Sequence, residues 1–134
     1  MRSAVPRRPY HQGCRRHQPV FQFHGAARTL QNTFVYCHCF YPEAVQCFDT
    51  LTDCENVYFD ISSVADDPEK LPQIKLAAEA AIRRIPERIL FGSDFGSCSQ
   101  RAHLDFAAAL DITAPARARL MYQNACRLYA FTND

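Results

Sequence analysis

The chain has 134 residues, a formal net charge of +1 at pH 7 and an isoelectric point near 7.6. That length fits one domain with a buried core of its own. The balanced charge gives no indication of a nucleic-acid partner, and no apolar run approaches the about 18 residues that cross a membrane. We therefore expect neither a nucleic-acid-binding protein nor a membrane protein.

The cysteines indicate the cellular compartment. Seven cysteines are an odd number, and residues 1–18 are basic and polar without the apolar segment of a secretory signal. Buried free thiols in a reducing cytoplasm explain them better than a disulfide framework does. The run Cys37-His38-Cys39 also suggests zinc-finger ligands. Adjacent strand residues point to opposite faces, however, and no second ligand pair stands at finger spacing.

The predicted elements follow an irregular lead-in. Residues 1–18 show no periodicity, whereas residues 19–134 alternate between strand and helix patterns and form the predicted domain. The predicted strands cover residues 19–24, 34–38, 56–62 and 89–91. The predicted helices follow Pro42, span residues 71–85, run from Ser97 or Ser99 to Leu110, and start again at Thr113 with Pro115 in the first turn. Strands that alternate with helices predict βαβ units and a parallel sheet.

Apolar spacing defines the faces of two predicted helices. In residues 71–85 the apolar side chains recur every three or four residues, as in a helix with one buried face; they are Ile74, Ala77, Ala78, Ala81 and Ile85. The last helix is predicted to turn Leu120, Met121, Ala125 and Leu128 inward. Both helices are therefore expected to pack on the sheet.

A polar residue ends every predicted strand. These residues are His24, His38, Ser62 or Ser63, and Asp94. An acid at the end of a buried strand is costly unless it binds something, and the carboxyl edge of a parallel sheet is where α/β enzymes keep their functional groups. The pattern predicts a partial (β/α)₈ barrel, with about half of the ~250 residues that such a barrel usually takes.

His24, His38 and Asp94 would converge if their strands lie side by side. Imidazole and carboxylate groups suit Zn²⁺ or a similar divalent ion. A metal held in this way polarises a carbonyl or lowers the pKa of its bound water to about 7, and a nearby histidine or aspartate moves the proton. The same spacing also fits a simpler interpretation, in which the histidines are hydrogen-bonded core residues and Asp94 only caps the helix that starts near Ser99.

Four segments of the sequence resemble a known family. They read FVYCHCFYPEA, NVYFDISS, RIPERILFGSDFG and ARLMYQNACRLYAF, and they lie between Phe34 and Phe131. This region resembles the carboxy-terminal half of the amidohydrolase superfamily, the metal-dependent hydrolases related to aminocarboxymuconate-semialdehyde decarboxylase. The resemblance implies that the second segment is the seventh barrel strand, the third the eighth strand, and the fourth the closing helix.

The resemblance also implies roles for the residues at the strand ends. Asp94 matches the eighth-strand aspartate, which binds the metal or handles the proton of its water. His38 matches the sixth-strand histidine, a second-metal ligand or a substrate-facing acid or base, and His24 resembles the fifth-strand histidine, a metal ligand. The implied cofactor is a divalent metal, Zn²⁺ before others, and the implied substrate is a small molecule. Ser62 and Ser63 face the same rim, where they either touch substrate or form strand-end hydrogen bonds.

The sequence departs from the family pattern in two places. The family's first strand carries a His-x-His pair that supplies two metal ligands, and this sequence holds none; His11 and His17 are too far apart to replace it. Residues 25–33 are also too few for a crossover with a full helix, which needs about 10–12 residues. Either this connection has lost its helix or residues 19–24 are not the fifth strand.

The half barrel would also be physically incomplete. A sheet of the last four strands is expected to expose two edges and an open face. Such a chain is expected to associate with itself or with a partner chain that completes the barrel. Two hypotheses follow. The chain is a fragment of an amidohydrolase-type hydrolase or decarboxylase that lacks the His-x-His pair, or it is a non-catalytic remnant or interaction domain with the half-barrel fold and no metal chemistry.

Overall fold

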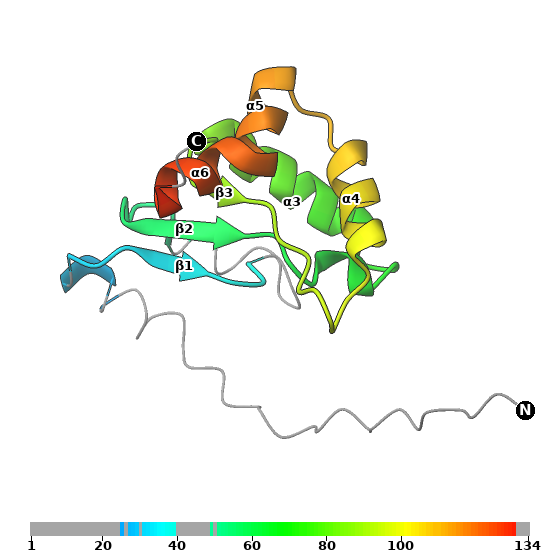
Figure 1. Ribbon diagram of the computed structural model, residues 1–134, viewed down its shortest axis with the longest axis horizontal. Coiled ribbons are helices and arrows are strands. Elements are labelled where there is room, and N and C mark those ends of the chain that lie inside the picture. Colours follow the sequence, from blue (N-terminus) through cyan, green and yellow to red (C-terminus); the bar gives the residue numbers. More distant parts are fainter. Residues whose placement is uncertain (1–24, 26, 30, 40–48, 50, 131–134) are drawn as a thin grey trace, which may run out of the picture.

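The computed structural model describes residues 25, 27–29, 31–39, 49 and 51–130, and Figure 1 shows their arrangement. The strands are β1 (Phe34–Tyr36), β2 (Val57–Asp60) and β3 (Ile89–Leu90). The helices are α3 (Leu71–Arg84), α4 (Gln100–Ala109), α5 (Ala114–Ala118) and α6 (Asn124–Tyr129), with a 3₁₀ turn η1 (Val64–Asp66) and a π-helical turn η2 (Arg119–Gln123). None of these helices has the length and apolar character required to cross a bilayer.

The three strands form one parallel sheet in the order β1-β2-β3. Phe34 of β1 pairs with Val57 of β2, and Phe59 of β2 pairs with Ile89 of β3. Helix α3 connects β2 to β3, so the predicted βαβ unit and the parallel sheet are confirmed. The predicted strand 19–24 and most of the predicted helix after Pro42 lie outside the described residues.

The core lies between the sheet and the helices. Along β2, Val57 and Phe59 are fully buried, whereas Tyr58 and Asp60 are half-buried, because successive strand residues point to opposite faces. Figure 1 shows α3, α5 and α6 toward the β3 side of the sheet and α4 beyond the carboxyl ends of the strands. The buried residues that join the strands to these helices include Ile61, Ile74, Ala78, Ala81, Ile82, Ile89, Phe106, Leu110 and Leu120. The apolar face predicted for residues 71–85 is therefore the face that packs on the sheet.

Two helix starts match the capping residues expected from the sequence. The side-chain oxygen of Ser99 accepts a hydrogen bond from the amide of Ala102 at 3.2 Å and begins α4. Thr113 accepts from the amide of Ala116 at 3.4 Å and begins α5, with a proline in the first turn. These bonds satisfy amides that have no partner within the helix. Asp94 is therefore not the cap of α4, as the simpler interpretation of the sequence required.

One expected sheet edge is covered. The carbonyls of Arg88 and Leu90 accept hydrogen bonds from β2, so the polar groups of Ile89 and Phe91 point to the opposite edge. The Phe91 amide donates to the Leu120 carbonyl at 3.0 Å, and the Nδ2 of Asn124 donates to the Ile89 carbonyl at 2.8 Å. The expectation of two exposed edges is thus wrong for β3, because the last helical segment takes the place of a neighbouring strand there.

The connection before β1 contains a short helical turn. Residues 25 and 27–29 are helical. The other alternative, that residues 19–24 are not the fifth strand, concerns residues outside the described ones. The Nδ2 of Asn56 donates to the carbonyls of Ala27 and Asn32, at 2.9 and 2.8 Å. These two bonds tie the short connection to the start of β2.

Candidate functional site

The three strands end in the same unusual backbone conformation. His38, Ser63 and Asp94 follow β1, β2 and β3, and their φ angles are 58°, 59° and 53°. Residues other than glycine seldom adopt this left-handed conformation, and when they do they cluster at functional sites. The carboxyl edge of the sheet therefore holds strained turns that carry the predicted site residues His38 and Asp94 after the two outer strands, on either side of β2.

The imidazole of His38 is held by a serine from the next strand. The hydroxyl of Ser62 and the Nδ1 of His38 are hydrogen-bonded at 2.8 Å. The histidine is exposed, while Ser62 is only 4 % exposed. The ring is thus anchored through one nitrogen, and Nε2 is the nitrogen that can meet a ligand.

The carboxylate of Asp94 is held by Ser63, the residue that follows Ser62. The hydroxyl of Ser63 donates to Oδ2 of Asp94 at 3.3 Å, and the thiol of Cys98 donates to the same oxygen at 3.7 Å. The Asp94 carbonyl accepts from the amides of Ser97 and Cys98, both at 3.0 Å, which closes the turn that precedes α4. All the hydrogen bonds that the carboxylate accepts from described residues therefore go to Oδ2.

Asp60 is a site residue that the sequence interpretation missed. Its Oδ1 accepts from the amide of Ser62 at 2.6 Å, and the carboxylate lies over Gly92 of the neighbouring chain segment. A Cβ atom at Gly92 would stand 2.5 Å from Oδ2 of Asp60, which is closer than atoms pack. The signal was present in the sequence, because Asp60 alternates with buried residues of β2 and a glycine after a strand often marks a close approach.

The carboxyl ends of β1, β2 and β3 form the rim of the sheet, and Cys37 shows that this rim is electronegative. Burial raises the pKa of this thiol, and the negative charges of Asp60 and Asp94 raise it further. The thiol is therefore protonated at neutral pH. Since one thiol feels both carboxylates, the ends of β1, β2 and β3 share one electrostatic environment.

A second missed residue, His103, has a structural role. It is fully buried; its Nδ1 and the Ser99 carbonyl are hydrogen-bonded at 2.8 Å, and its Nε2 accepts from the amide of Ala65 at 3.4 Å. Both ring nitrogens are thus occupied by main-chain groups, one of the N-cap residue Ser99 and one of Ala65 in η1. This histidine, and not His38, has the hydrogen-bonded core environment that the simpler interpretation assigned to histidines.

The described residues do not by themselves fit a metal ion. Within them, no three His, Cys, Asp or Glu side chains gather as a metal-binding group. His38 and Asp94 are two candidate ligands, whereas catalytic zinc usually has three protein ligands. The third predicted ligand, His24, lies outside the described residues.

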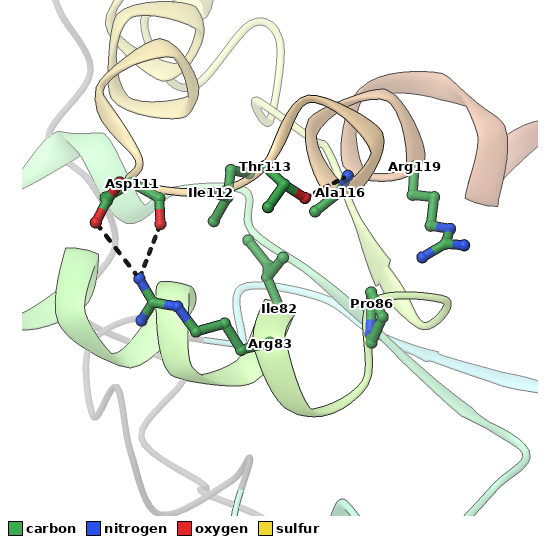
Figure 2. Close-up of a pocket in the computed structure, with 8 residues that line it drawn as sticks. All are labelled: Ile82, Arg83, Pro86, Asp111, Ile112, Thr113, Ala116 and Arg119. Carbon is green, nitrogen blue, oxygen red and sulfur yellow. Dashed lines mark hydrogen bonds and ion pairs between the residues drawn. The ribbon is translucent and has the colours of Figure 1, made fainter.

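The cavity in Figure 2 lies away from this rim. It has a volume of about 520 Å³ between α3 and α5, and Pro86, which forms part of its wall, precedes β3. Figure 2 shows Arg83 directed toward Asp111, with an ion pair at 3.7 Å. The cavity is therefore at the amino side of the sheet and contributes no side chain to the site around Asp94.

Comparisons with known proteins agree with this arrangement. Residues 9–131 match the sequence profile of the amidohydrolase family. The fold is similar to the crystal structure of 5-carboxyvanillate decarboxylase from Sphingomonas paucimobilis, with a TM-score of 0.50 and 18 % identity over 83 % of this chain. That match covers 28 % of the decarboxylase chain, so this chain spans less than a third of it. No curated protein matches the sequence.

Proposed function

Since the chain belongs to the amidohydrolase family, we propose that it forms the part of a metal-dependent hydrolase or decarboxylase that carries the acid-base residues Asp94 and His38. Members of this family typically bind a divalent metal and act on small molecules. For this chain we propose Zn²⁺ and a small-molecule substrate. The partial-barrel architecture, with β1, β2 and β3 as the last three barrel strands, is part of the same proposal.

The bonding of Asp94 is the observation that carries the proposal. Ser63 and Cys98 both bond Oδ2, and within the described residues nothing bonds Oδ1. A half-buried carboxylate with one oxygen tied and the other oxygen untied is arranged to receive a ligand or a proton. Because Asp94 is partly exposed, its Oδ1 is available to water, to a substrate or to a metal ion.

The chemistry follows from the two groups at the rim. In hydrolysis, Oδ1 of Asp94 accepts a proton from the attacking water, and His38 donates a proton to the leaving group. In decarboxylation, one of the two groups protonates the carbon atom that loses carbon dioxide. In this proposal Asp94 and His24 would hold a divalent ion, which would supply polarisation of the substrate and acidification of its water.

The remaining barrel strands have to come from further polypeptide or from a second chain. We propose that this chain associates with itself or with a partner at the open face of its sheet. The half-buried Tyr58 and Asp60 lie on the face that the described helices leave uncovered. Sedimentation velocity of the purified chain tests this: a dimer supports self-association, and a monomer at all concentrations rejects it.

A second candidate is a domain that keeps the fold without metal chemistry. The observation in its favour is that the described residues supply only two ligands where catalytic zinc needs three. Such a domain would serve as an interaction module. The hydrogen-bonded side chains of His38 and Asp94 would then be remnants of a lost catalytic site.

Metal analysis of the purified chain separates the two candidates. We expect one Zn²⁺ per chain or per assembly in the unaltered protein and a loss of bound metal in Asp94→Asn. The matched control is Asp105→Asn, because Asp105 is an exposed acid on α4 whose partner among the described residues is Arg101. Metal-free protein in all three forms, with equal stability, rejects the metal-dependent function.

A further inference from the structure

We propose that the adjacent serines Ser62 and Ser63 are positioning residues that hold the two acid-base groups of the site from one turn. Ser62 orients His38 on one side, and Ser63 orients Asp94 on the other. The catalytic consequence rests on the proposed function, but the geometry can be tested without it.

The position of β2 makes this possible. It is the central strand of the sheet, with β1 on one side and β3 on the other. The turn that follows β2 therefore reaches both neighbours. The hydroxyl of Ser62 bonds His38 after β1 at 2.8 Å, and the hydroxyl of Ser63 bonds Asp94 after β3 at 3.3 Å. Both serines are buried, at 4 % and 8 % exposure, so neither hydroxyl is free to turn toward water.

The backbone of Ser63 explains how consecutive residues reach opposite neighbours. Its φ and ψ are 59° and −2°, a left-handed conformation that is unfavourable for serine. Contacts around the turn must therefore maintain it. The result is a pair of side chains that diverge toward two different strands within one residue step.

Two flanking contacts hold the turn in place. Before it, Oδ1 of Asp60 accepts from the Ser62 amide at 2.6 Å, and Gly92 leaves the room that this carboxylate needs. After it, the buried ring of His103 accepts from the amide of Ala65 at 3.4 Å. Asp60 thus closes the turn locally and His103 attaches its far end to α4, which gives the serines a rigid base.

The bonds of Ser62 to His38 and of Ser63 to Asp94 together form a bridge between the two outer strands, and this bridge determines which atoms can react. The Ser62 hydroxyl can bond Nδ1 of His38 as donor or as acceptor. In the proposed arrangement Nδ1–H donates to it, so that Nε2 carries no proton and can meet a ligand. The Ser63 bond occupies Oδ2 of Asp94 and leaves Oδ1. Side chains that orient reacting groups in this way act through other residues, and their loss commonly reduces metal affinity or activity 10–100-fold, in the order of magnitude known for such partners.

The ring nitrogens of His38 test the first half of the bridge. In the full ¹⁵N-labelled chain at a pH where the ring is neutral, we expect the two nitrogen shifts of the Nδ1–H tautomer. Ser62→Thr, which keeps the hydroxyl, should keep that signature, and Ser62→Ala should give averaged shifts. The control Ser97→Ala, at an exposed serine in the neighbouring turn, should change nothing. Averaged shifts in the unaltered chain overturn the proposal even if Ser62→Ala does not fold.

A double-mutant cycle tests the second half. We expect Ser63→Ala to lower the urea midpoint of the unaltered chain. The shift should be smaller when Asp94 is already replaced by glycine, which tolerates the left-handed conformation, because only the contact of Ser63 with the Cys98 thiol at 3.5 Å then remains to be lost. An equal shift in both backgrounds overturns the Ser63–Asp94 bond. Neither readout requires turnover. A negative result for the serine bonds therefore does not affect the metal analysis, and a negative metal analysis does not affect the test of the serine bonds.

Discussion

The two ends of the sheet use side-chain hydrogen bonds in different ways. At the amino end, the guanidinium of Arg88 donates to the carbonyls of Thr52, Cys54 and Val57. At the carboxyl end, serine hydroxyls bond the side chains of His38 and Asp94. The first arrangement ties side chains to main chain, and the second ties side chains to each other.

This difference separates stability from function. A side chain that satisfies buried carbonyls leaves them unpaired when it is removed, and the fold loses that free energy. A side chain that orients another exposed or half-buried group leaves little unpaired, so its loss changes geometry more than stability. We therefore expect substitutions at the amino end to lower the free energy of unfolding more than those at the carboxyl edge.

The largest effect is expected at Asn124. Its Nδ2 donates to the carbonyls of Pro86 and Ile89, at 2.7 and 2.8 Å, and the residue is 1 % exposed. Asn124→Ala leaves both carbonyls without this partner and should lower the free energy of unfolding by about 2–5 kcal/mol. Urea denaturation measures this. The exposed neighbour Gln123→Ala is the control, and equal effects of the two substitutions would contradict the assignment.

Gly92→Ala probes the carboxyl edge through a steric change. The added Cβ would collide with the Asp60 carboxylate and must displace it, which should lower stability by about 1–3 kcal/mol. It should also disturb the His38 ring signals, because Asp60 anchors Ser62. Gly25→Ala is the matched control, since a Cβ there meets nothing within 4 Å. A fully stable Gly92→Ala protein with unchanged ring signals would break the link from Asp60 to the site.

Ser99→Ala sharpens the comparison, because this serine near the carboxyl edge bonds main chain. Its loss leaves the amide of Ala102 without a cap and should cost about 1 kcal/mol. Thermal unfolding of Ser99→Ala beside Ser97→Ala measures the difference. If Ser99→Ala costs no more than Ser97→Ala, the type of bond does not explain the contrast between the two ends.

The smallest effect is expected at an exposed ion pair. Arg101 and Asp105 lie one helical turn apart on α4, 3.0 Å from each other, and both are exposed. Arg101→Ala should change the free energy of unfolding by less than about 1 kcal/mol, because water screens such pairs. Stability measured at low and high salt provides the check. A loss as large as that of Asn124→Ala would show that surface pairs of side chains also hold this fold.

Several elements could be predicted because their causes are local. The apolar spacing of residues 71–85 predicts α3, and Ser99 and Thr113 are the caps observed at α4 and α5. The alternation of strands and helices predicts the parallel sheet. The end positions of His38 and Asp94 follow from the same alternation, whereas their roles, and that of His24, stay predictions.

Contacts between distant segments could not be predicted in the same way. Three contacts each join residues that lie 32 to 38 positions apart in the chain. They are Asp60 with Gly92, Ala65 with His103, and Ile89 with Asn124. Periodicity reports which face a residue occupies, but it does not report which atom lies opposite. The expectation that β3 has an exposed edge was wrong for this reason.

The sequence by itself therefore determined the family, the order of the elements and the carboxyl-edge position of His38 and Asp94. Spacing along the chain is sufficient for these, because they depend on local periodicity and on motifs read in order. Only the tertiary structure decided that Ser62 and Ser63 divide between the two neighbours of the central strand. That division depends on strand order and on one left-handed residue, which arise only when the three strands lie side by side.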